Sequence, residues 1–146
     1  DSGEHGDTSF IPWSGAYVSG VSLDEYYETV EKMGRNVTKI DKDAMLEYVR
    51  TSGGQVIANK GATFYAVSVA VCKLVATILS SSDSVATVSS MMHGEYGIED
   101  VCLSTLTLVG PKGVQGKIPM RMTKEEVEKL KASADALKAV IAQIEH

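Results

Sequence analysis

The chain has 146 residues, of which 44% are hydrophobic and 23% are charged, and its formal net charge is -5 at pH 7. This composition is typical of a globular protein of about one domain, long enough to bury a hydrophobic core, and it excludes disorder as the main state. The acidic balance, with no stripe of lysine and arginine, argues against a nucleic-acid-binding surface.

The first segment of the chain contains His5, the histidine that is the best candidate for a catalytic residue. His5 lies between Gly3 and Gly6, where no bulky neighbour shields it, so we expect its imidazole to be exposed rather than buried. The carboxylates of Glu4 and Asp7 flank it. Histidine titrates near neutral pH and can both give and take a proton. The same residue types also build turns, so an ordinary solvent-exposed loop explains the pattern as well. A metal site from these side chains is disfavoured, because adjacent loop positions point apart.

Short strands and a capped helix are expected next. Residues 10–21 mix apolar and small residues, with glycines between them, and predict one or two short strands. Ser22 and Glu25 have the spacing of a capping box, which predicts a helix from there to about Met33.

The middle of the chain is predicted to be helical. A second helix should begin near Asp41, kink at the glycine pair of residues 53–54 and break at Gly61. The most apolar stretch of the chain follows at residues 62–79. Hydroxyl side chains and Lys73 interrupt it, and its flanks lack the aromatic belt of a membrane span. The pattern therefore favours a buried central helix against which the other elements pack.

The two cysteines, Cys72 and Cys102, lie in apolar stretches and lack the spacing of a zinc or redox pair. We expect both to be buried free thiols. Free thiols suit a reducing cytoplasm, and no signal peptide contradicts that location.

The last part of the chain predicts a sheet and an amphipathic helix. The sheet is an antiparallel meander of three strands at residues 84–92, 101–109 and 114–118. His93 falls at its first turn and is interpreted as a surface residue. A capping box begins at Thr123, and apolar residues then recur every three or four positions to residue 144. Residues 1–146 are thus expected to form a single α+β domain, with a long buried central helix and a C-terminal amphipathic helix packed on an antiparallel sheet.

Five motifs follow one another along the chain. They are Gly3-Glu4-His5-Gly6-Asp7-Thr8 with Trp13-Ser14, Lys60-Gly61-Ala62-Thr63-Phe64-Tyr65, Gly94-Glu95-Tyr96-Gly97-Ile98, Leu103-Ser104 and Gly110-Pro111-Lys112-Gly113. This series resembles the ordered landmarks of the lactate/malate dehydrogenase family and covers nearly the whole chain. The resemblance implies the C-terminal, substrate-binding and catalytic domain of an NAD-dependent L-lactate dehydrogenase. A malate or other L-2-hydroxy-acid dehydrogenase is the alternative.

The resemblance also implies roles for three residues. His5 would be the proton donor and acceptor in hydride transfer between NAD and a 2-oxo acid such as pyruvate. Thr63 would lie beside the substrate on the central helix, and Val67, one turn further on, would pack near the nicotinamide. From the residues alone, a threonine bonded to its own helix backbone and a valine in the core stay open as alternatives. No metal site is expected.

The family's nucleotide-binding half precedes these motifs, and no Gly-x-Gly-x-x-Gly pattern after a strand occurs in this chain. We therefore expect an excised part of a longer enzyme, inactive by itself, whose upstream Rossmann domain binds most of the NAD. That half would also supply an aspartate that holds the histidine and an arginine that binds the substrate carboxylate. The expected partners are a small 2-oxo or 2-hydroxy acid, the upstream domain and further copies of the full-length subunit, with no nucleic acid and no membrane. A non-catalytic interaction module is the alternative from another class of protein.

Two positions depart from the family's pattern. The glycine pair at residues 53–54 stands where relatives commonly carry larger residues, and this could widen the wall of the substrate pocket. Leu106 stands where many relatives carry proline. The first departure leaves malate or longer 2-hydroxy acids open as substrates. The final Glu145-His146 pair resembles a tag remnant, and His146 is given no role.

Overall fold

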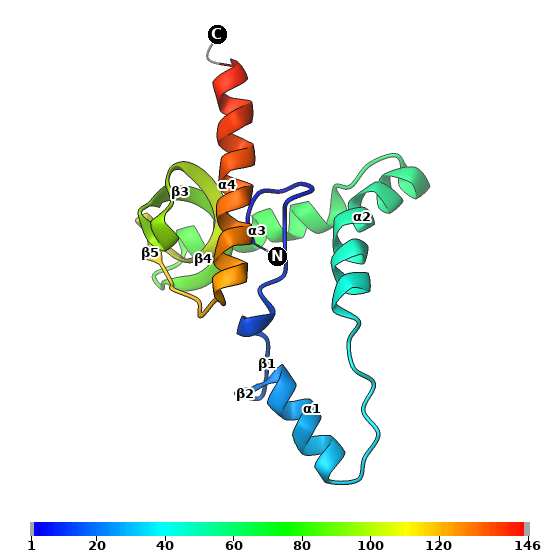
Figure 1. Cartoon of the computed structure of the whole chain (residues 1–146). Coiled ribbons are helices and arrows are strands. Elements are labelled where there is room, and N and C mark those ends of the chain that lie inside the picture. Colours follow the sequence, from blue (N-terminus) through cyan, green and yellow to red (C-terminus); the bar gives the residue numbers. More distant parts are fainter. Residues whose placement is uncertain (1, 145–146) are drawn as a thin grey trace.

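A computed structural model describes residues 2–144, so Glu145 and His146 lie outside the described residues. Figure 1 shows the sheet and the C-terminal helix side by side, with the other helices reaching away from them. The elements in chain order are η1 (Trp13–Gly15), β1 (Tyr17–Val18), β2 (Val21–Ser22), α1 (Leu23–Lys32), α2 (Lys42–Lys60), α3 (Tyr65–Leu79), β3 (Ser84–His93), η2 (Glu95–Gly97), β4 (Glu99–Gly110), β5 (Gly113–Lys117) and α4 (Lys124–Ile144). The predicted α+β class is confirmed.

The sheet and α4 enclose the hydrophobic core. Strands β3, β4 and β5 form an antiparallel sheet in that order, as the meander predicted. Helix α4 packs against β4. Side chains from this sheet, from α4 and from the N-terminal segment form one buried cluster: Phe10, Met92, Ile98, Val101, Leu103, Leu130 and Ala134.

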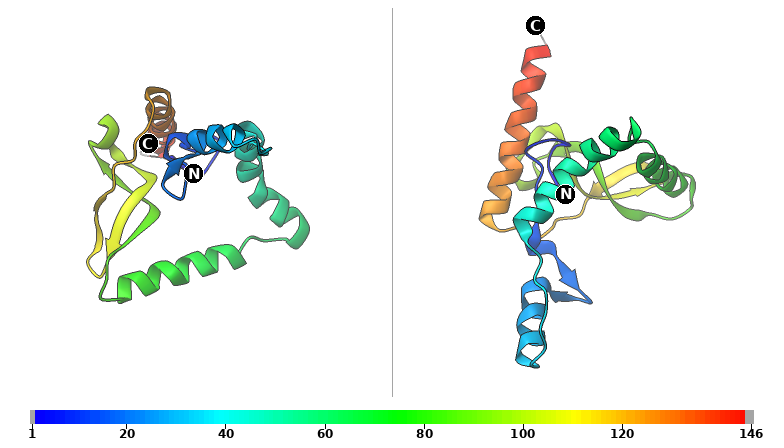
Figure 2. Two further views of the ribbon diagram at one scale, coloured as in Figure 1. Left: turned by 90° about the horizontal axis from the view of Figure 1, so that it is seen from below. Right: turned by 90° about the vertical axis from the view of Figure 1, so that its right-hand side faces the viewer.

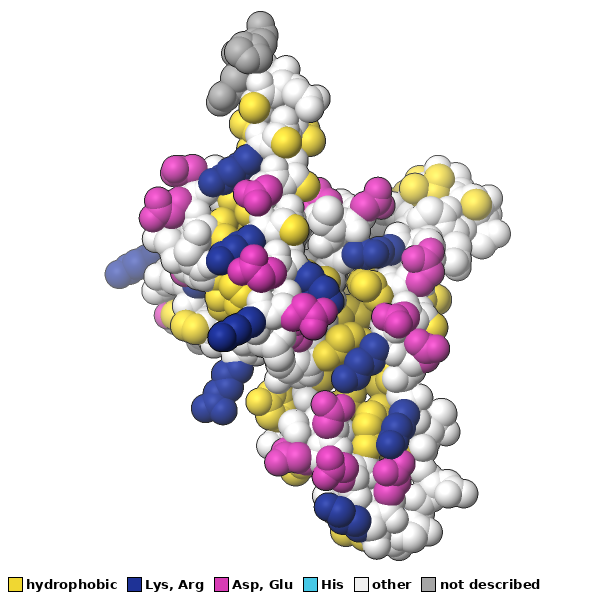
Figure 3. Space-filling model, viewed as in Figure 1, with side chains coloured by type: hydrophobic (Ala, Val, Ile, Leu, Met, Phe, Trp, Pro, Cys, Tyr) yellow, Lys and Arg dark blue, Asp and Glu magenta, His cyan; other side chains and the backbone are white. Residues whose placement is uncertain are grey.

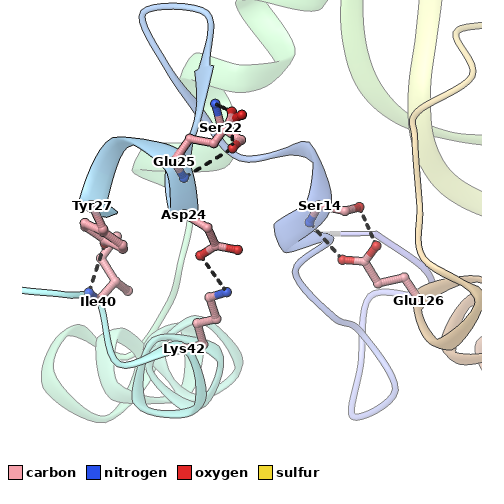
Figure 4. A network of polar contacts seen from close by, with 8 residues as sticks. All are labelled: Ser14, Ser22, Asp24, Glu25, Tyr27, Ile40, Lys42 and Glu126. Atoms are coloured by element: carbon pink, nitrogen blue, oxygen red, sulfur yellow. Dashed lines mark hydrogen bonds and ion pairs between the residues drawn. The ribbon is translucent and has the colours of Figure 1, made fainter. Parts of the chain in front are cut away.

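Local capping signals set where the helices begin. The Ser22 hydroxyl accepts the Glu25 amide and the Glu25 side chain accepts the Ser22 amide, so the predicted capping box begins α1 (Figure 4). Asp41 caps α2 by accepting two backbone amides. Gly61, with a φ of 78°, ends it in the left-handed region that glycine adopts without strain. Between these ends α2 is one helix, and Figure 1 shows it changing direction part-way along its length, in agreement with the kink predicted at residues 53–54.

The predicted burial of the central helix is wrong. Helix α3 forms where the apolar stretch predicted a helix, but none of its residues is buried, and the same holds for α2. Figure 2 shows α3 running away from the sheet and α2 lying between the far end of α3 and the N-terminal segment, so that the two helices form an arm. Figure 3 shows hydrophobic side chains at the molecular surface in the region of α2. The physical reason is that, among the described residues, α3 packs mainly against β4 and leaves most of its surface uncovered.

The two cysteines are free thiols, as predicted, but both are exposed rather than buried. Cys72 lies on α3 and shares the exposure of that helix. Cys102 lies on β4 between the buried Val101 and Leu103, and successive strand residues point to opposite faces of a sheet. The apolar neighbours of each cysteine in the sequence therefore did not predict whether its thiol is buried.

Within residues 2–144, no single helix is both long and apolar enough to span a bilayer. Helices α2 and α3 meet those limits only when they are taken together, and the pair is bent by 119° at the break between them.

Candidate functional site

The N-terminal segment forms a loop whose base is fixed to the sheet. The backbones of Ser2 and Phe10 exchange two hydrogen bonds, of 2.9 and 3.1 Å, which close the loop. Gly3 pairs in the same way with Ser104 of β4, at 3.2 and 2.9 Å. The base is buried, whereas His5 at the tip is exposed. The structure thus presents the imidazole on a short, anchored loop.

A pocket of about 280 Å³ lies between this loop and α2. His5, Gly6, Asp7 and Ser9 line one side of it, and Val49, Arg50, Ser52 and Gly53 line the other. The Arg50 guanidinium donates hydrogen bonds to the Ser9 carbonyl, 3.1 Å from Nε, and so joins α2 to the loop. Nothing in the local sequence signals this contact, because the two residues are 41 positions apart.

Thr63 lies in the segment between α2 and α3, not on the helix where it was expected. It is exposed and lines a second pocket, of about 360 Å³, together with Ala62, Phe64 and residues of α2. Ser52 and Gly53 line both pockets. The fold therefore brings His5 and Thr63 to adjoining pockets that share one wall on α2.

Val67 is on the exposed arm. It lies on α3 with 54% of its surface accessible and does not line either of the two pockets. Its side chain is therefore open to a partner rather than part of the chain's own core. His93 ends β3, is exposed and donates its backbone amide to the Glu95 carboxylate at 2.6 Å, which agrees with a surface turn.

The segment that follows the loop is tied to the start of α4. The Ser14 amide donates to the Glu126 carboxylate at 3.0 Å, and the Ser14 hydroxyl also contacts that carboxylate (Figure 4). Glu126 is only 8% exposed and accepts a further hydrogen bond from the Thr123 amide at 2.8 Å. Burial alone would raise the pKa of Glu126, but the hydrogen bonds from Ser14 and Thr123 outweigh burial and lower that pKa below its ordinary value. The capping box predicted the contact with Thr123 and missed the contact with Ser14.

Metal chemistry finds no support in the described part of the chain. Among residues 2–144, no three His, Cys, Asp or Glu side chains gather as metal ligands do.

Comparisons with known proteins converge on one family. The sequence model described as lactate/malate dehydrogenase, alpha/beta C-terminal domain, matches residues 2–146. The L-lactate dehydrogenase of Thermoanaerobacterium saccharolyticum is 41% identical over 143 residues, which are 98% of this chain and 45% of the relative. That of Acetivibrio thermocellus is 36% identical over 143 residues, which are 98% of this chain and 44% of the relative. This chain thus spans less than half the length of these relatives.

Solved structures agree. The minor L-lactate dehydrogenase from Enterococcus mundtii, in a ligands-bound form, superposes with a TM-score of 0.88 at 29% identity, covering 98% of this chain and 44% of that one. The malate dehydrogenase from Archaeoglobus fulgidus, in complex with NADH, superposes with a TM-score of 0.77 at 26% identity, covering 99% of this chain and 43% of that one.

Proposed function

Because this chain belongs to the lactate/malate dehydrogenase family, as its C-terminal α/β domain, we propose that it is the substrate-binding and catalytic domain of an NAD-dependent L-lactate dehydrogenase. One observation carries the proposal: the exposed His5, on an anchored loop, faces a pocket that adjoins the pocket of Thr63. A proton donor and a hydroxyl side chain around adjoining cavities suit the carbonyl end of a small 2-oxo acid.

The chemistry follows from charge development on the substrate. Bound NADH would supply the hydride that reaches the carbonyl carbon of pyruvate, and negative charge would build on the carbonyl oxygen. A protonated His5 stabilises that charge and donates its proton to the oxygen. In the reverse direction, neutral His5 takes the hydroxyl proton of lactate. The exposed position of the imidazole in the pocket allows a substrate oxygen to come within hydrogen-bond reach.

The chain's own residues fit only the nicotinamide end of the cofactor. Val67 offers an exposed apolar surface one turn beyond the Thr63 segment. No glycine-rich phosphate-binding motif occurs in the sequence, so the rest of the cofactor would be held elsewhere. The relatives are more than twice as long, and this supports an upstream Rossmann domain as the partner of the arm. Further copies of the full-length subunit and a cytoplasmic location belong to the same proposal.

A second substrate class has support from the pocket wall. A Cβ at Gly53 or Gly54 would meet no atom within 4 Å, and Gly53 lines both pockets. A larger side chain at Gly53 would therefore project into open space that the glycine leaves to a substrate. This favours malate or longer 2-hydroxy acids as alternatives to lactate.

The test uses the full-length protein and a panel of 2-oxo acids with NADH. Pyruvate is expected to be the best substrate, and a preference for oxaloacetate or a longer acid would support the alternative class. The variant His5→Gln keeps a polar side chain but cannot cycle a proton, so kcat should fall by roughly two to four orders of magnitude while NADH binding is retained. The 146-residue chain alone is expected to show no turnover.

His93→Gln is the matched control, because His93 is exposed at the end of β3 and lies outside both pockets. It should leave kcat unchanged. If His5→Gln kept a kcat close to that of wild type, His5 would be an ordinary loop residue and the catalytic proposal would be wrong.

A further inference from the structure

Helix α4 places a buried hydroxyl directly beneath the histidine loop. Ser133 is 0% exposed, and its Oγ accepts the Glu4 amide at 2.7 Å, across 129 residues of sequence. The same Oγ lies 3.0 Å from Thr8 Oγ1. Thr8 in turn contacts the Glu4 carboxylate, at 2.6 Å from its hydroxyl and 3.1 Å from its amide. Glu4, Thr8 and Ser133 thus form a closed ring of hydrogen bonds, and Glu4 is the residue directly before His5.

The protons in this set can be assigned from chemistry. A carboxylate only accepts hydrogen bonds and a hydroxyl carries one proton, so the Thr8 hydroxyl donates to Glu4. Ser133 must then donate to Thr8 while it accepts the Glu4 amide. The hydrogen bonds from the Thr8 side chain and then from its backbone lower the pKa of Glu4, which keeps the carboxylate ionised at neutral pH. The three hydrogen bonds of the ring then run in one direction, from the Glu4 amide to Ser133, from Ser133 to Thr8 and from Thr8 to the Glu4 carboxylate.

The two glycines beside His5 are explained by this ring. Gly3 has a φ of +98°, and a Cβ there would lie 2.7 Å from Ser133 Oγ. A Cβ at Gly6 would lie 2.9 Å from Glu4 Oε1. Both distances are too short for a carbon atom that any other residue would carry. The glycines therefore let the loop close onto Ser133 and let the Glu4 carboxylate fold back to Thr8.

Helix α4 holds the same segment at a second point. Its buried residues are Glu126, Leu130, Ser133 and Ala134, whose spacing places them on one face of the helix. Glu126 holds Ser14, about two turns from where Ser133 holds Glu4 and Thr8. The two polar residues of this buried face therefore fix the chain on both sides of the His5 tip.

We propose that Ser133 is a positioning residue for His5, acting through the ring that it forms with Glu4 and Thr8. This inference rests on the proposed function of His5. Ser133 lines none of the pockets around His5 or Thr63, so it has no direct part in substrate binding. It fixes the backbone immediately before His5, and a displacement of about 1 Å at a reacting group can cost on the order of a hundredfold in rate.

The first experiment measures pyruvate reduction by the full-length enzyme. Ser133→Ala and Thr8→Val each remove one hydroxyl of the ring, and each should lower kcat on the order of ten- to hundredfold with little change in KM for pyruvate. Thr8→Ser keeps the hydroxyl and should restore most of the kcat that Thr8→Val loses. The double variant should be no worse than the poorer single variant, because both changes break the same ring.

Thr107→Val is the matched control. Thr107 is also 0% exposed, and its hydroxyl donates to the Thr105 carbonyl at 3.0 Å on β4, away from the loop. This variant should lower the melting temperature without lowering kcat at temperatures well below it. If Ser133→Ala behaved in the same way, Ser133 would be a structural residue only and the inference would be overturned.

A second readout does not depend on turnover. Hydrogen–deuterium exchange should become faster in peptides that cover residues 2–10 of Ser133→Ala and stay unchanged in those that cover β3. Unchanged exchange in residues 2–10 would overturn the anchoring role of Ser133. If wild-type enzyme reduced no 2-oxo acid, the proposed function would fail, and the exchange result would still decide whether Ser133 anchors the loop.

Discussion

Two regions of this domain contain apolar residues, and they differ in whether those residues are buried. The sheet body, which comprises residues 2–10, the sheet β3–β5 with its turns, and α4, contains all seven residues of the main buried cluster. The arm, which comprises α2, α3 and the segment between them, contains no buried residue in its two helices. The difference shows that an apolar sequence predicts a surface that favours burial but does not predict which element covers that surface.

The candidate site is divided between these two regions. His5 belongs to the sheet body, whose β4 and α4 fix its loop. Gly53, Thr63 and Val67 belong to the arm. The proposed proton donor is thus held by the sheet body, while the opposite wall of the pocket lies on helices that expose apolar surface. In the proposed enzyme, the upstream domain would cover the arm and complete its side of the site, whereas the His5 loop is already held by the sheet body.

The largest expected effect tests the comparison itself, in the 146-residue chain. Leu103 is 0% exposed within the core, so Leu103→Ala should lower the free energy of unfolding by about 2 to 5 kcal/mol. Val71 on α3 is 53% exposed, so Val71→Ala should change it by less than about 0.5 kcal/mol. Urea denaturation of the two variants and wild type measures both values.

A large loss of stability from Val71→Ala would break the comparison, because it would mean that α3 is covered in solution. In the full-length protein the same change should become more costly if the upstream domain packs on the arm. A second copy of the chain packed there would instead make stability depend on protein concentration.

What the sequence predicted correctly depends on neighbouring residues. The capping boxes at Ser22 and Thr123 and the alternating strands are local patterns, and the corresponding elements are present. The exposure of α3 and of Cys102 depends on which elements lie opposite them, and no local pattern contains that information. Residues that hold the His5 loop, such as Arg50 and Ser133, are 41 and more than 100 positions from their partners. The roles of His5, Thr63 and Val67 stay predictions.

A smaller effect sharpens the division of the site. Thr63 is exposed and outside the core, so Thr63→Ile in the full-length enzyme should raise KM for pyruvate on the order of tenfold by filling the pocket, with little loss of thermal stability. Thr63→Ser retains the hydroxyl without added bulk and should stay near wild type. A clear drop in the melting temperature of Thr63→Ile without a rise in its KM for pyruvate would place Thr63 in a packed interior.

The smallest effect concerns the attachment of the sheet body to the segment after His5, through Glu126. The pKa of this carboxyl is lowered in the folded chain, so its ionised form stabilises the fold above the ordinary glutamate pKa of about 4.3. That stability is lost as the pH falls through this value towards the lowered pKa.

Glu126→Gln removes the charge that accepts hydrogen bonds from Ser14 and Thr123 and should cost about 1 kcal/mol at pH 7. The gap between variant and wild type should then shrink at a pH below the ordinary glutamate pKa of about 4.3, because wild type loses the charge as the pH falls towards the lowered pKa. Urea denaturation at both pH values measures the gap, and Glu125→Gln, at an exposed neighbouring carboxylate, is the control. A gap that stayed constant with pH would show that the charge on Glu126 does not hold Ser14, and the second attachment of the His5 segment to α4 would then rest on packing alone.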